Sequence, residues 1–202
     1  MFDAIVVGSG ISGGWVAKEL TEKGLKVLVL ERGRNIEHGT DYNDGLMPWE
    51  QENEGRVNED EVARDYAIQS TTYPFSSANK NFWVKDSEHP YSTPDGKPFE
   101  WIRGFHLGGR SLMWGRMSLR LSDLDFAANK KDGHGSDWPI RYADLSPWYD
   151  HVEAFAGVSG SKEGLSQLPD GDFLKAMGMN DVEADFKKKI EAQFPGRTVI
   201  PP

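Results

Sequence analysis

The chain has 202 residues, enough for one sizeable hydrophobic core with a small appendage. Its formal net charge of −9, with no basic run, argues against a nucleic-acid-binding surface. The chain contains no cysteine, which excludes a disulfide framework, a thiol nucleophile and a cysteine-ligated metal. Its apolar runs are too short to span a bilayer, and a strand that starts at residue 2 leaves no room for a signal peptide, so a cytoplasmic protein is the default expectation.

The first 33 residues predict the order strand, glycine turn, helix, strand. Residues 2–7 are β-branched and nearly free of charge, which is typical of a strand buried on both faces of a parallel sheet. Residues 14–23 have helical periodicity, and Gly24 is expected to end that helix. Residues 26–30 predict a second buried strand, and Glu31 closes it.

The turn between the first strand and the helix carries three regularly spaced glycines. Gly8 allows a tight turn out of the strand, Gly10 lets the backbone approach a pyrophosphate, and Gly13 lets the helix pack closely on the strand. Phosphates would meet free N–H groups and the positive end of the helix dipole there, and Ser9 and Ser12 are candidate phosphate ligands. The surrounding strand, helix and acid are the context that a dinucleotide-binding motif requires.

Glu31 lies at the tip of the second strand, where a carboxylate can accept hydrogen bonds from both hydroxyls of an adenosine ribose. The same carboxylate would repel a ribose 2′-phosphate, which argues against NADP. The motif by itself does not decide between NAD and FAD.

The following segment is long and irregular. Residues 34–57 contain glycine, proline and many polar residues, without sustained helical or strand periodicity. We therefore expect residues 34–70 to form a lid folded over the cofactor. A short helix is expected to start at 58–61. Residues 70–91 are rich in aromatic residues and are candidates for strands, and residues 93–98 have the composition of a tight hairpin turn.

Residues 103–116 form a second glycine-rich stretch, whose backbone could pass close to a ligand. Composition alone equally allows an ordinary surface loop. His106 is the histidine of choice for contact with a cofactor or substrate, because it precedes this loop. Arg103, Arg110 and Arg116 could neutralise a diphosphate, hold the lid, or be ordinary surface cations.

The rest of the chain predicts two amphipathic helices. One lies within 142–155, with Ser146 as its N-cap and Pro147 as its first residue. The other spans 181–194. Further expected elements are a helix start at 122–125, a Gly/Ser-rich connector over 157–171 and a strand over 197–200.

With both glycine-rich stretches considered together, the chain resembles the N-terminal part of the glucose-methanol-choline (GMC) oxidoreductases over essentially its whole length. Glu31-Arg32-Gly33 is similar to the E-x-G ending of FAD-binding families, and Leu107 to Ser111 matches the L-G-G-x-S loop near the flavin. The resemblance implies an α/β fold: a Rossmann-like FAD-binding βαβ domain with a long lid and a glycine-rich flavin loop, incomplete without its C-terminal part. The implied segments are a βαβ unit at 1–33, a lid at 34–70, a flavin loop at 103–120, and a connector and helix at 157–202 that lead towards a substrate domain.

Trp114 departs from the commoner pattern of the family, which has asparagine there. With tryptophan at this position, the chain is similar to the branch of sugar dehydrogenases and pyranose 2-oxidase. In pyranose 2-oxidase the preceding residue is a histidine bonded covalently to the flavin, whereas Met113 lacks that chemistry, so the resemblance implies FAD held non-covalently.

The resemblance implies an enzyme that oxidises a secondary CH–OH group of a sugar or glycoside by hydride transfer to flavin N5. The family's catalytic histidine pair belongs to a part outside these 202 residues, so this chain would supply FAD binding, no catalytic residue and no metal ligand. The electron acceptor stays open, with a separate subunit or protein as one alternative. A non-catalytic nucleotide-binding fragment and an NAD-dependent dehydrogenase remain as alternative functions. The predicted cofactor-binding residues are Gly8, Ser9, Gly10, Ser12, Gly13, Glu31, Arg32, Leu107, Gly108, Gly109, Arg110, Ser111, Met113, Trp114 and Gly115.

Overall fold

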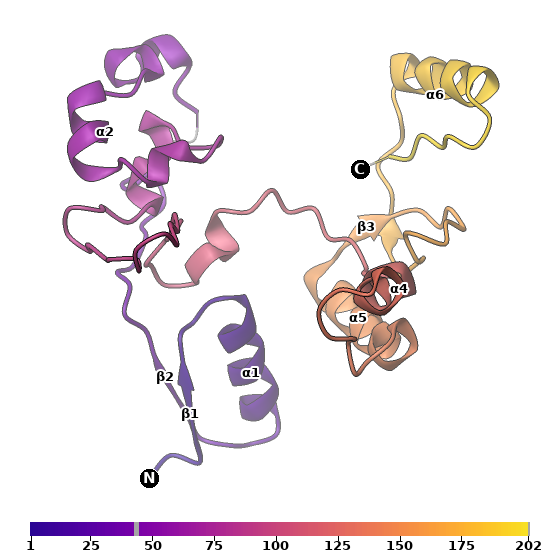
Figure 1. Cartoon of the computed structure of the whole chain (residues 1–202), viewed down its shortest axis with the longest axis horizontal. Coiled ribbons are helices and arrows are strands. Elements are labelled where there is room, and N and C mark those ends of the chain that lie inside the picture. Colours follow the sequence, from indigo (N-terminus) through magenta and orange to yellow (C-terminus); the bar gives the residue numbers. More distant parts are fainter. Residues whose placement is uncertain (43–44, 202) are drawn as a thin grey trace. The chain divides into compact units, whose positions relative to one another are not determined.

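A computed structural model describes residues 1–42 and 45–201 of the chain. The chain divides into two compact units, Met1–Gly115 and Arg116–Pro202 (Figure 1), and each is described by itself. Among the described residues, no helix combines the length and the apolar character that a membrane span needs.

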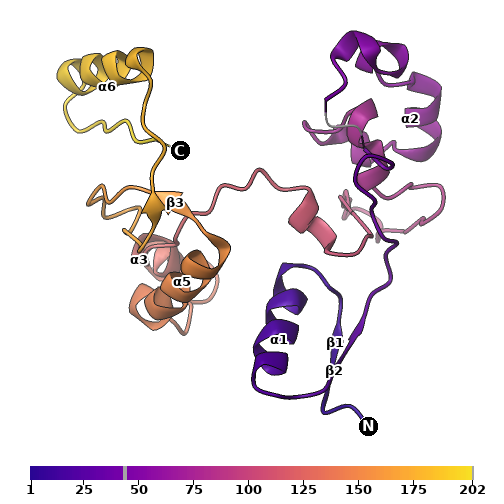
Figure 2. The ribbon, with the colours of Figure 1, turned by 180° about the vertical axis from the view of Figure 1, so that it is seen from behind.

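The first unit begins with the predicted strand, helix and strand. They are β1 (Ala4–Val7), α1 (Ile11–Glu22) and β2 (Val27–Leu30). The two strands are parallel, in a register that runs from Ala4 opposite Val27 to Val7 opposite Leu30. Figure 2 shows α1 beside this pair. The end of α1 is the predicted one, because Gly24 adopts φ +85° and donates its N–H to the carbonyl of Thr21 at 2.9 Å.

The prediction that the first strand is buried on both faces is wrong for this chain. Val6 is 8% exposed, whereas Ile5 and Val7 are 62% and 83% exposed. Successive side chains of a strand point to opposite faces, so Val6 faces α1 and its neighbours point away from it. No described segment of the unit covers that second face.

In the part of the first unit after β2 that the structure describes, there are one α-helix and several short 3₁₀ helices. The helix α2 (Glu59–Asp65) confirms the predicted helix start, because the side chain of Asn58 accepts a hydrogen bond from the N–H of Glu61 at 3.1 Å. The 3₁₀ helices are η1 (Pro48–Glu50), η2 (Glu52–Gly55), η3 (Gln69–Thr71), η4 (Ser77–Phe82) and η5 (Gly109–Leu112).

The strands considered for residues 70–91 are not formed among the described residues. Asn79 holds the chain in a turn instead: its side-chain oxygen accepts hydrogen bonds from Ser76 N–H at 2.8 Å and from the indole of Trp83 at 3.1 Å. Its amide donates to the carbonyl of Pro74 at 2.6 Å. These local bonds satisfy backbone groups of the turn, so that pairing in a strand would bring no additional hydrogen bonds.

The tight turn within 93–98 is formed, but it does not join two strands. Lys97 donates its N–H to the carbonyl of Pro94 at 3.1 Å. The flanking segments are joined by the hydroxyl of Tyr91, which donates to the carbonyl of Phe99 at 2.5 Å and accepts the N–H of Trp101 at 2.7 Å. A single side chain therefore replaces the expected hairpin ladder.

Aromatic residues form the core of the first unit. Tyr66, Trp83 and Val84 are between 2% and 8% exposed. The ring of Phe75 lies 5.3 Å from that of Tyr66 and 6.0 Å from that of Trp83, distances typical of favourable aromatic pairs.

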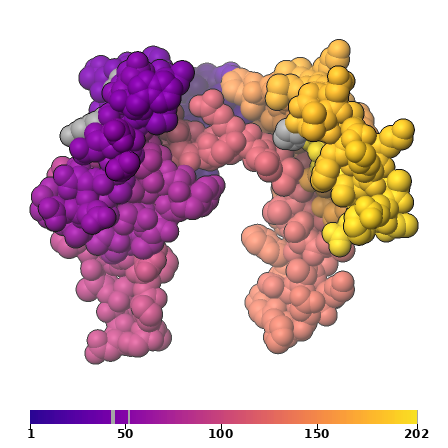
Figure 3. Space-filling view, turned by 90° about the horizontal axis from the view of Figure 1, so that it is seen from above, coloured from indigo at the N-terminus to yellow at the C-terminus, as the bar shows by residue number. Residues whose placement is uncertain are grey.

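The regular elements of the second unit are mainly helices, and the last of them lies in the yellow part of Figure 3. The predicted helix start at 122–125 is confirmed, because the hydroxyl of Ser122 accepts the N–H of Leu124 at 3.2 Å. The strands β3 and β4 are two residues each and pair in parallel. The elements are α3 (Asp123–Phe126), α4 (Ala128–Asp132), α5 (Tyr142–Ala156), β3 (Ser159–Gly160), β4 (Leu174–Lys175) and α6 (Asp181–Gln193).

The predicted start of the helix at 142–155 is wrong. The helix α5 begins at Tyr142 and contains Pro147, so Ser146 is not its N-cap. Two carboxylates fix the earlier start: Asp144 accepts the N–H of Arg141 at 2.7 Å, and Asp123 accepts the N–H of Tyr142 at 2.8 Å. Those acceptors satisfy free N–H groups of the first turn and extend the helix upstream of the proline.

The helix α6 confirms the second predicted helix, and its apolar residues Val182 and Phe186 are 78% and 55% exposed. The side chain of Asn180 caps it by accepting the N–H groups of Val182 and Glu183, each at 3.0 Å. The strand expected at 197–200 is not formed, because Lys187 binds the carbonyl of Val199 at 2.6 Å and so ties this segment to the helix.

Candidate functional site

The glycine turn leaves the amino end of α1 open. Gly8 adopts φ +91° and donates its N–H to the carbonyl of Leu30 at 2.7 Å, which ties the turn to β2. A Cβ atom added at Gly8 or Gly10 would meet no atom within 4 Å. The first turn of α1 has neither a side-chain cap nor an acidic residue. Its N–H groups therefore face open space at the positive end of the helix dipole, where an anion is favoured.

Gly13 provides the close packing that its position in the motif predicts. A Cβ atom there would lie 1.9 Å from the carbonyl oxygen of Gly8 and 3.3 Å from Cγ1 of Val6. The first distance is far below van der Waals contact, and the carbonyl is fixed backbone. Only glycine lets α1 lie this close to β1.

Glu31 lies beside the glycine turn with its carboxylate already hydrogen-bonded. Oε2 accepts the N–H of Ser9 at 2.8 Å and the hydroxyl of Ser9 at 2.6 Å. Oε1 accepts the N–H of Gly33 at 2.8 Å. These donors, the Ser9 hydroxyl foremost, lower the pKa of Glu31 to about 2. The site therefore holds a fixed negative charge, as a ribose-binding acid requires.

The second glycine-rich stretch touches the first. The N–H of Gly108 donates to the hydroxyl oxygen of Ser9 at 2.9 Å, across 99 positions of sequence. A Cβ atom at Gly109 would lie 3.1 Å from Cα of Gly10. The hydroxyl of Ser111 donates to the carbonyl of Gly108 at 2.5 Å and closes the loop on itself. The structure thus brings together the two motifs that the sequence singled out.

The chain enters this loop alongside the continuation of β2. Leu107 donates its N–H to the carbonyl of Arg34 at 2.8 Å, and residues 34 and 106 form an isolated parallel bridge. Gly33 makes this approach possible, because a Cβ atom there would lie 2.2 Å from the backbone nitrogen of His106.

A cavity of about 390 Å³ adjoins the carboxyl end of β2. The guanidinium of Arg32 lies 3.8 Å from the ring centre of Phe105, in cation–π contact. The cavity is large enough for a small aromatic ligand. Its lining includes Arg32, Gly33, Arg34, Tyr66, Phe82 and Phe105.

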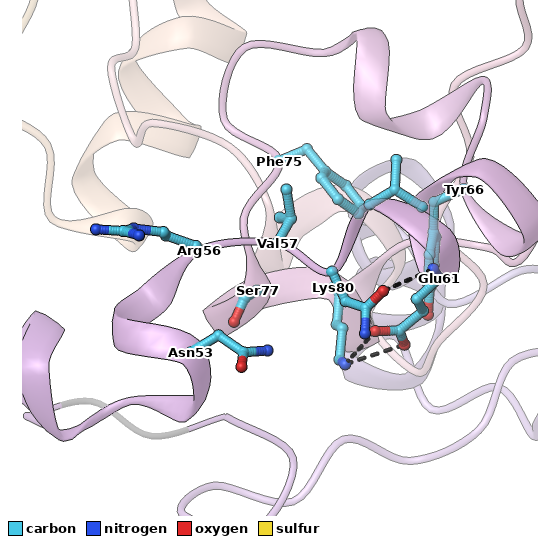
Figure 4. Close-up of a pocket in the computed structure, with 10 residues that line it drawn as sticks. Asn53, Arg56, Val57, Glu61, Tyr66, Phe75, Ser77 and Lys80 are labelled. Carbon is cyan, nitrogen blue, oxygen red and sulfur yellow. Dashed lines mark hydrogen bonds and ion pairs between the residues drawn. The ribbon is translucent and has the colours of Figure 1, made fainter.

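A second pocket, shown in Figure 4, is too small to be a ligand site. Its volume is about 20 Å³, room for about one water molecule. The ammonium of Lys80 lies in it, 2.8 Å from the carboxylate of Glu61. This pair connects α2 to η4.

The other predicted cofactor-binding residues lie around the loop. Arg110 donates to the carbonyl of Ile102 at 3.3 Å. The sulfur of Met113 packs on Gly104, where a Cβ atom would lie 2.5 Å from it. Leu107 and Trp114 are 50% and 44% exposed, and Ser12 is exposed in the first turn of α1. Gly115 is the last residue of the first unit, so the predicted segment 103–120 crosses the boundary between the units.

His106 lies in the interior of the first unit. It is 1% exposed, and neither ring nitrogen has a hydrogen-bond partner. Its ring meets that of Phe82 edge-on, at 5.7 Å between centres. Burial lowers the pKa of His106, so the imidazole is neutral at physiological pH. Its position is that of a core residue beneath the loop, and contact with a cofactor or substrate stays a prediction.

A buried polar network that the sequence did not reveal fixes the segment before the loop. Gln69 is 0% exposed and accepts the N–H of Arg103 at 2.7 Å. Its amide donates to Asp86 at 2.8 Å and to the carbonyl of Trp101 at 3.0 Å. The guanidinium of Arg103 pairs with Asp86 at 3.2 Å, so Arg103 holds this segment in place, and its 5% exposure keeps it away from an external diphosphate.

Comparison with known proteins identifies the family of this chain. The model for the family described as FAD dependent oxidoreductase matches residues 3–116. The gluconate 2-dehydrogenase flavoprotein of Pantoea cypripedii is 29% identical over 171 residues, which make up 79% of this chain and 26% of that protein. The fructose dehydrogenase large subunit of Gluconobacter japonicus is 28% identical over 160 residues, or 78% of this chain and 27% of that protein.

An oxygen-dependent choline dehydrogenase of Xanthomonas axonopodis pv. citri (strain 306) is 29% identical over 192 residues, or 95% of this chain and 29% of that protein. The chain thus spans about a quarter of the length of the curated relatives it matches. The family implies a Rossmann-like FAD-binding fold, in agreement with the parallel β1–α1–β2 unit. Because the family match covers more than half of the chain and takes in the glycine turn, Glu31 and the loop at 107–115, this chain belongs to the FAD-dependent oxidoreductases, as its resemblance to the GMC enzymes predicted.

Proposed function

We propose that this chain is the FAD-binding part of an oxidoreductase that oxidises a CH–OH group of a sugar or another alcohol. The observation that carries the proposal is the junction of the two glycine-rich motifs at Ser9. There the open amino end of α1, the ionised Glu31 and the loop at 107–112 share one site. A dinucleotide needs these three features side by side, for its phosphates, its ribose and its reactive ring.

The residues of the site suit each part of FAD. The N–H groups after Gly10 would hold the diphosphate, because they face open space. Glu31 would accept the ribose hydroxyls, and the cavity lined by Arg32 and Gly33, the residues that follow it, would hold the base. The remaining predicted contacts, from Leu107 to Gly115, would line the flavin. Met113 offers no nucleophile for a covalent bond, which supports non-covalent binding.

FAD supplies the acceptor for the two electrons that leave the alcohol, while this chain binds and orients it. The finer parts of the proposal are a secondary CH–OH group of a sugar or glycoside, hydride transfer to flavin N5 and a catalytic histidine pair outside these 202 residues. The names of the gluconate and fructose dehydrogenases support a sugar, and that of the choline dehydrogenase keeps other alcohols in the substrate class.

Two further elements complete the proposal. The segment 34–70, which contains α2, the 3₁₀ helices η1 and η2 and the start of η3, would cover the cofactor as a lid. Electrons would then pass to an acceptor outside this chain. The fructose dehydrogenase relative is named as a large subunit, which supports a further subunit in that role.

The direct test is cofactor binding by the full-length protein. We expect FAD to bind and NAD not to bind, and denaturation to release all flavin. Glu31→Arg should weaken FAD binding at least tenfold, because it removes the ribose acceptor and places a cation among N–H donors. Glu22→Arg makes the same change of charge at an exposed position of α1 and should leave FAD affinity unchanged. Tight binding of NAD, or equal FAD affinity of both variants, would contradict the proposal.

Activity then separates an enzyme from a nucleotide-binding fragment. Reduction of an artificial dye should depend on a sugar or alcohol substrate and on FAD. A full-length protein that binds FAD and reduces no dye with any of these substrates would favour the non-catalytic alternative.

A further inference from the structure

Ser9 makes more hydrogen bonds than its place in a glycine turn requires. Its N–H and its hydroxyl both donate to Oε2 of Glu31, at 2.8 and 2.6 Å. Its hydroxyl oxygen also accepts the N–H of Gly108 at 2.9 Å. One side chain therefore joins the acid at the end of β2 to the loop that starts 99 residues later.

The direction of these bonds gives the hydroxyl a defined orientation. A serine hydroxyl has one proton to donate and lone pairs to accept with. Because Glu31 is ionised, its carboxylate can only accept hydrogen bonds, and it accepts the one that the Ser9 hydroxyl donates. A lone pair of the hydroxyl oxygen is then left to accept the N–H of Gly108. The carboxylate of Glu31 thus determines how well Ser9 can hold the loop.

The hydrogen bonds within the loop, such as that from the Ser111 hydroxyl to the carbonyl of Gly108, are local, and the bond from Gly108 to Ser9 joins the loop to the glycine turn. Gly108 and Gly109 both have positive φ, at +85° and +55°, a conformation that glycine adopts with a high entropic cost on ordering. Gly109 also lies against the backbone of Gly10 without a side chain between them. A fixed acceptor at Ser9 offsets part of the cost of ordering this segment.

We propose that Ser9 is a positioning residue that uses the charge of Glu31 to hold the loop at 107–112 against the glycine turn before the cofactor binds. The inference rests on the proposed function in one respect, namely that this loop lines the flavin. A loop ordered in advance lowers the entropic cost of binding, so Ser9 contributes to FAD affinity without needing to touch FAD.

Amide hydrogen exchange in the cofactor-free full-length protein tests the contact itself. Ser9→Ala should speed exchange of the Gly108 amide about tenfold, the size of one lost hydrogen bond, and leave the amides within α1 unchanged. Ser9→Thr keeps a hydroxyl and should restore slow exchange. Ser70→Ala is the matched control, because its hydroxyl makes only a long local contact with Ala67, at 3.4 Å.

A double-mutant cycle tests the role of Glu31. Glu31→Gln should speed Gly108 exchange when Ser9 is present and have no further effect in Ser9→Ala, because the acid acts on the loop through the hydroxyl. Additive effects of the two substitutions would overturn the proposal, as would unchanged Gly108 exchange in Ser9→Ala.

Cofactor titration then links the contact to function. Ser9→Ala should bind FAD about tenfold more weakly than wild type, and Ser9→Thr should recover most of the affinity. Faster exchange with unchanged FAD affinity would overturn the positioning role. A wild-type protein that binds no FAD would overturn the proposed function instead, and the exchange cycle would still decide whether Glu31 holds the loop through Ser9.

Discussion

Arg120 and Glu153 form a buried, bidentate ion pair within the second unit. Nε and Nη2 of the arginine donate to the two carboxylate oxygens at 2.8 and 2.5 Å, and the residues are 4% and 5% exposed. The guanidinium also donates to the hydroxyl of Tyr142 at 2.8 Å and contacts Asp150. These acceptors hold the pKa of Arg120 above its ordinary value, so the charge is permanent. The pair joins the segment before α3 to the last turn of α5.

Removing one member of this pair should destabilise the second unit strongly. Arg120→Met leaves the carboxylate of Glu153 buried without its cation, which typically costs about 3 to 5 kcal/mol. The free energy of unfolding, measured by urea denaturation, should fall by that amount. Lys162→Met removes the cation of an exposed pair with Asp172, at 65% and 84% side-chain exposure, and should change it by less than about 1 kcal/mol. Equal effects of both substitutions would mean that the buried pair contributes no more than a surface contact.

Gly13 and Gly14 are adjacent in α1 and should respond in opposite ways to alanine. Gly13→Ala forces its Cβ against the carbonyl of Gly8, so we expect a loss of about 2 to 3 kcal/mol and weaker contact between α1 and β1. At Gly14 the nearest atom would be 3.8 Å away, and alanine favours a helix by roughly 0.5 to 1 kcal/mol over glycine. The midpoint temperature of thermal unfolding should therefore fall in Gly13→Ala. In Gly14→Ala it should stay the same or rise.

The sequence predicts best where a structure depends on neighbours in the chain. The helix end at Gly24 and the helix start at 58–61 are local signals, and each forms as expected. The start of α5 could not be predicted from neighbouring residues. Its first N–H group donates to Asp123, which belongs to another element, and the helix therefore starts upstream of the position that Pro147 predicted.

Contacts between distant residues could not be predicted in the same way. Gln69 and Arg103 carry no pattern that pairs them, yet their hydrogen bond fixes the approach to the candidate site. The bond from Gly108 to Ser9 was equally invisible, although both residues were predicted to bind the cofactor. Residue type and spacing predicted candidate residues for the site, and only the fold shows which of them contact one another.

The charge of Glu31 predicts a specific acid sensitivity. Its pKa lies at about 2, below the ordinary value of 4.5, because the folded state donates hydrogen bonds to the carboxylate. A depressed pKa stabilises the fold above the unfolded-state value, and that contribution is lost as the pH falls from about 4.5 towards 2. The difference in unfolding free energy between wild type and Glu31→Gln should therefore shrink over this range. In Ser9→Ala, which lacks the largest cause of the shift, the loss should begin at the same pH, be smaller in total and be complete at a higher pH.

Gln69 should be the most sensitive uncharged position before the loop. Gln69→Leu keeps the size of the side chain but leaves the N–H of Arg103, the carbonyl of Trp101 and one oxygen of Asp86 without this partner in a site of 0% exposure. Each buried unpaired group costs about 1 to 3 kcal/mol, so we expect a loss of about 3 kcal/mol in unfolding free energy, together with faster amide exchange at residue 103. Gln51→Leu removes a single bond, to the carbonyl of Leu46 at 3.1 Å, and should cost about 1 kcal/mol or less. If both variants were equally stable, the network would not be what fixes the segment that leads into the loop.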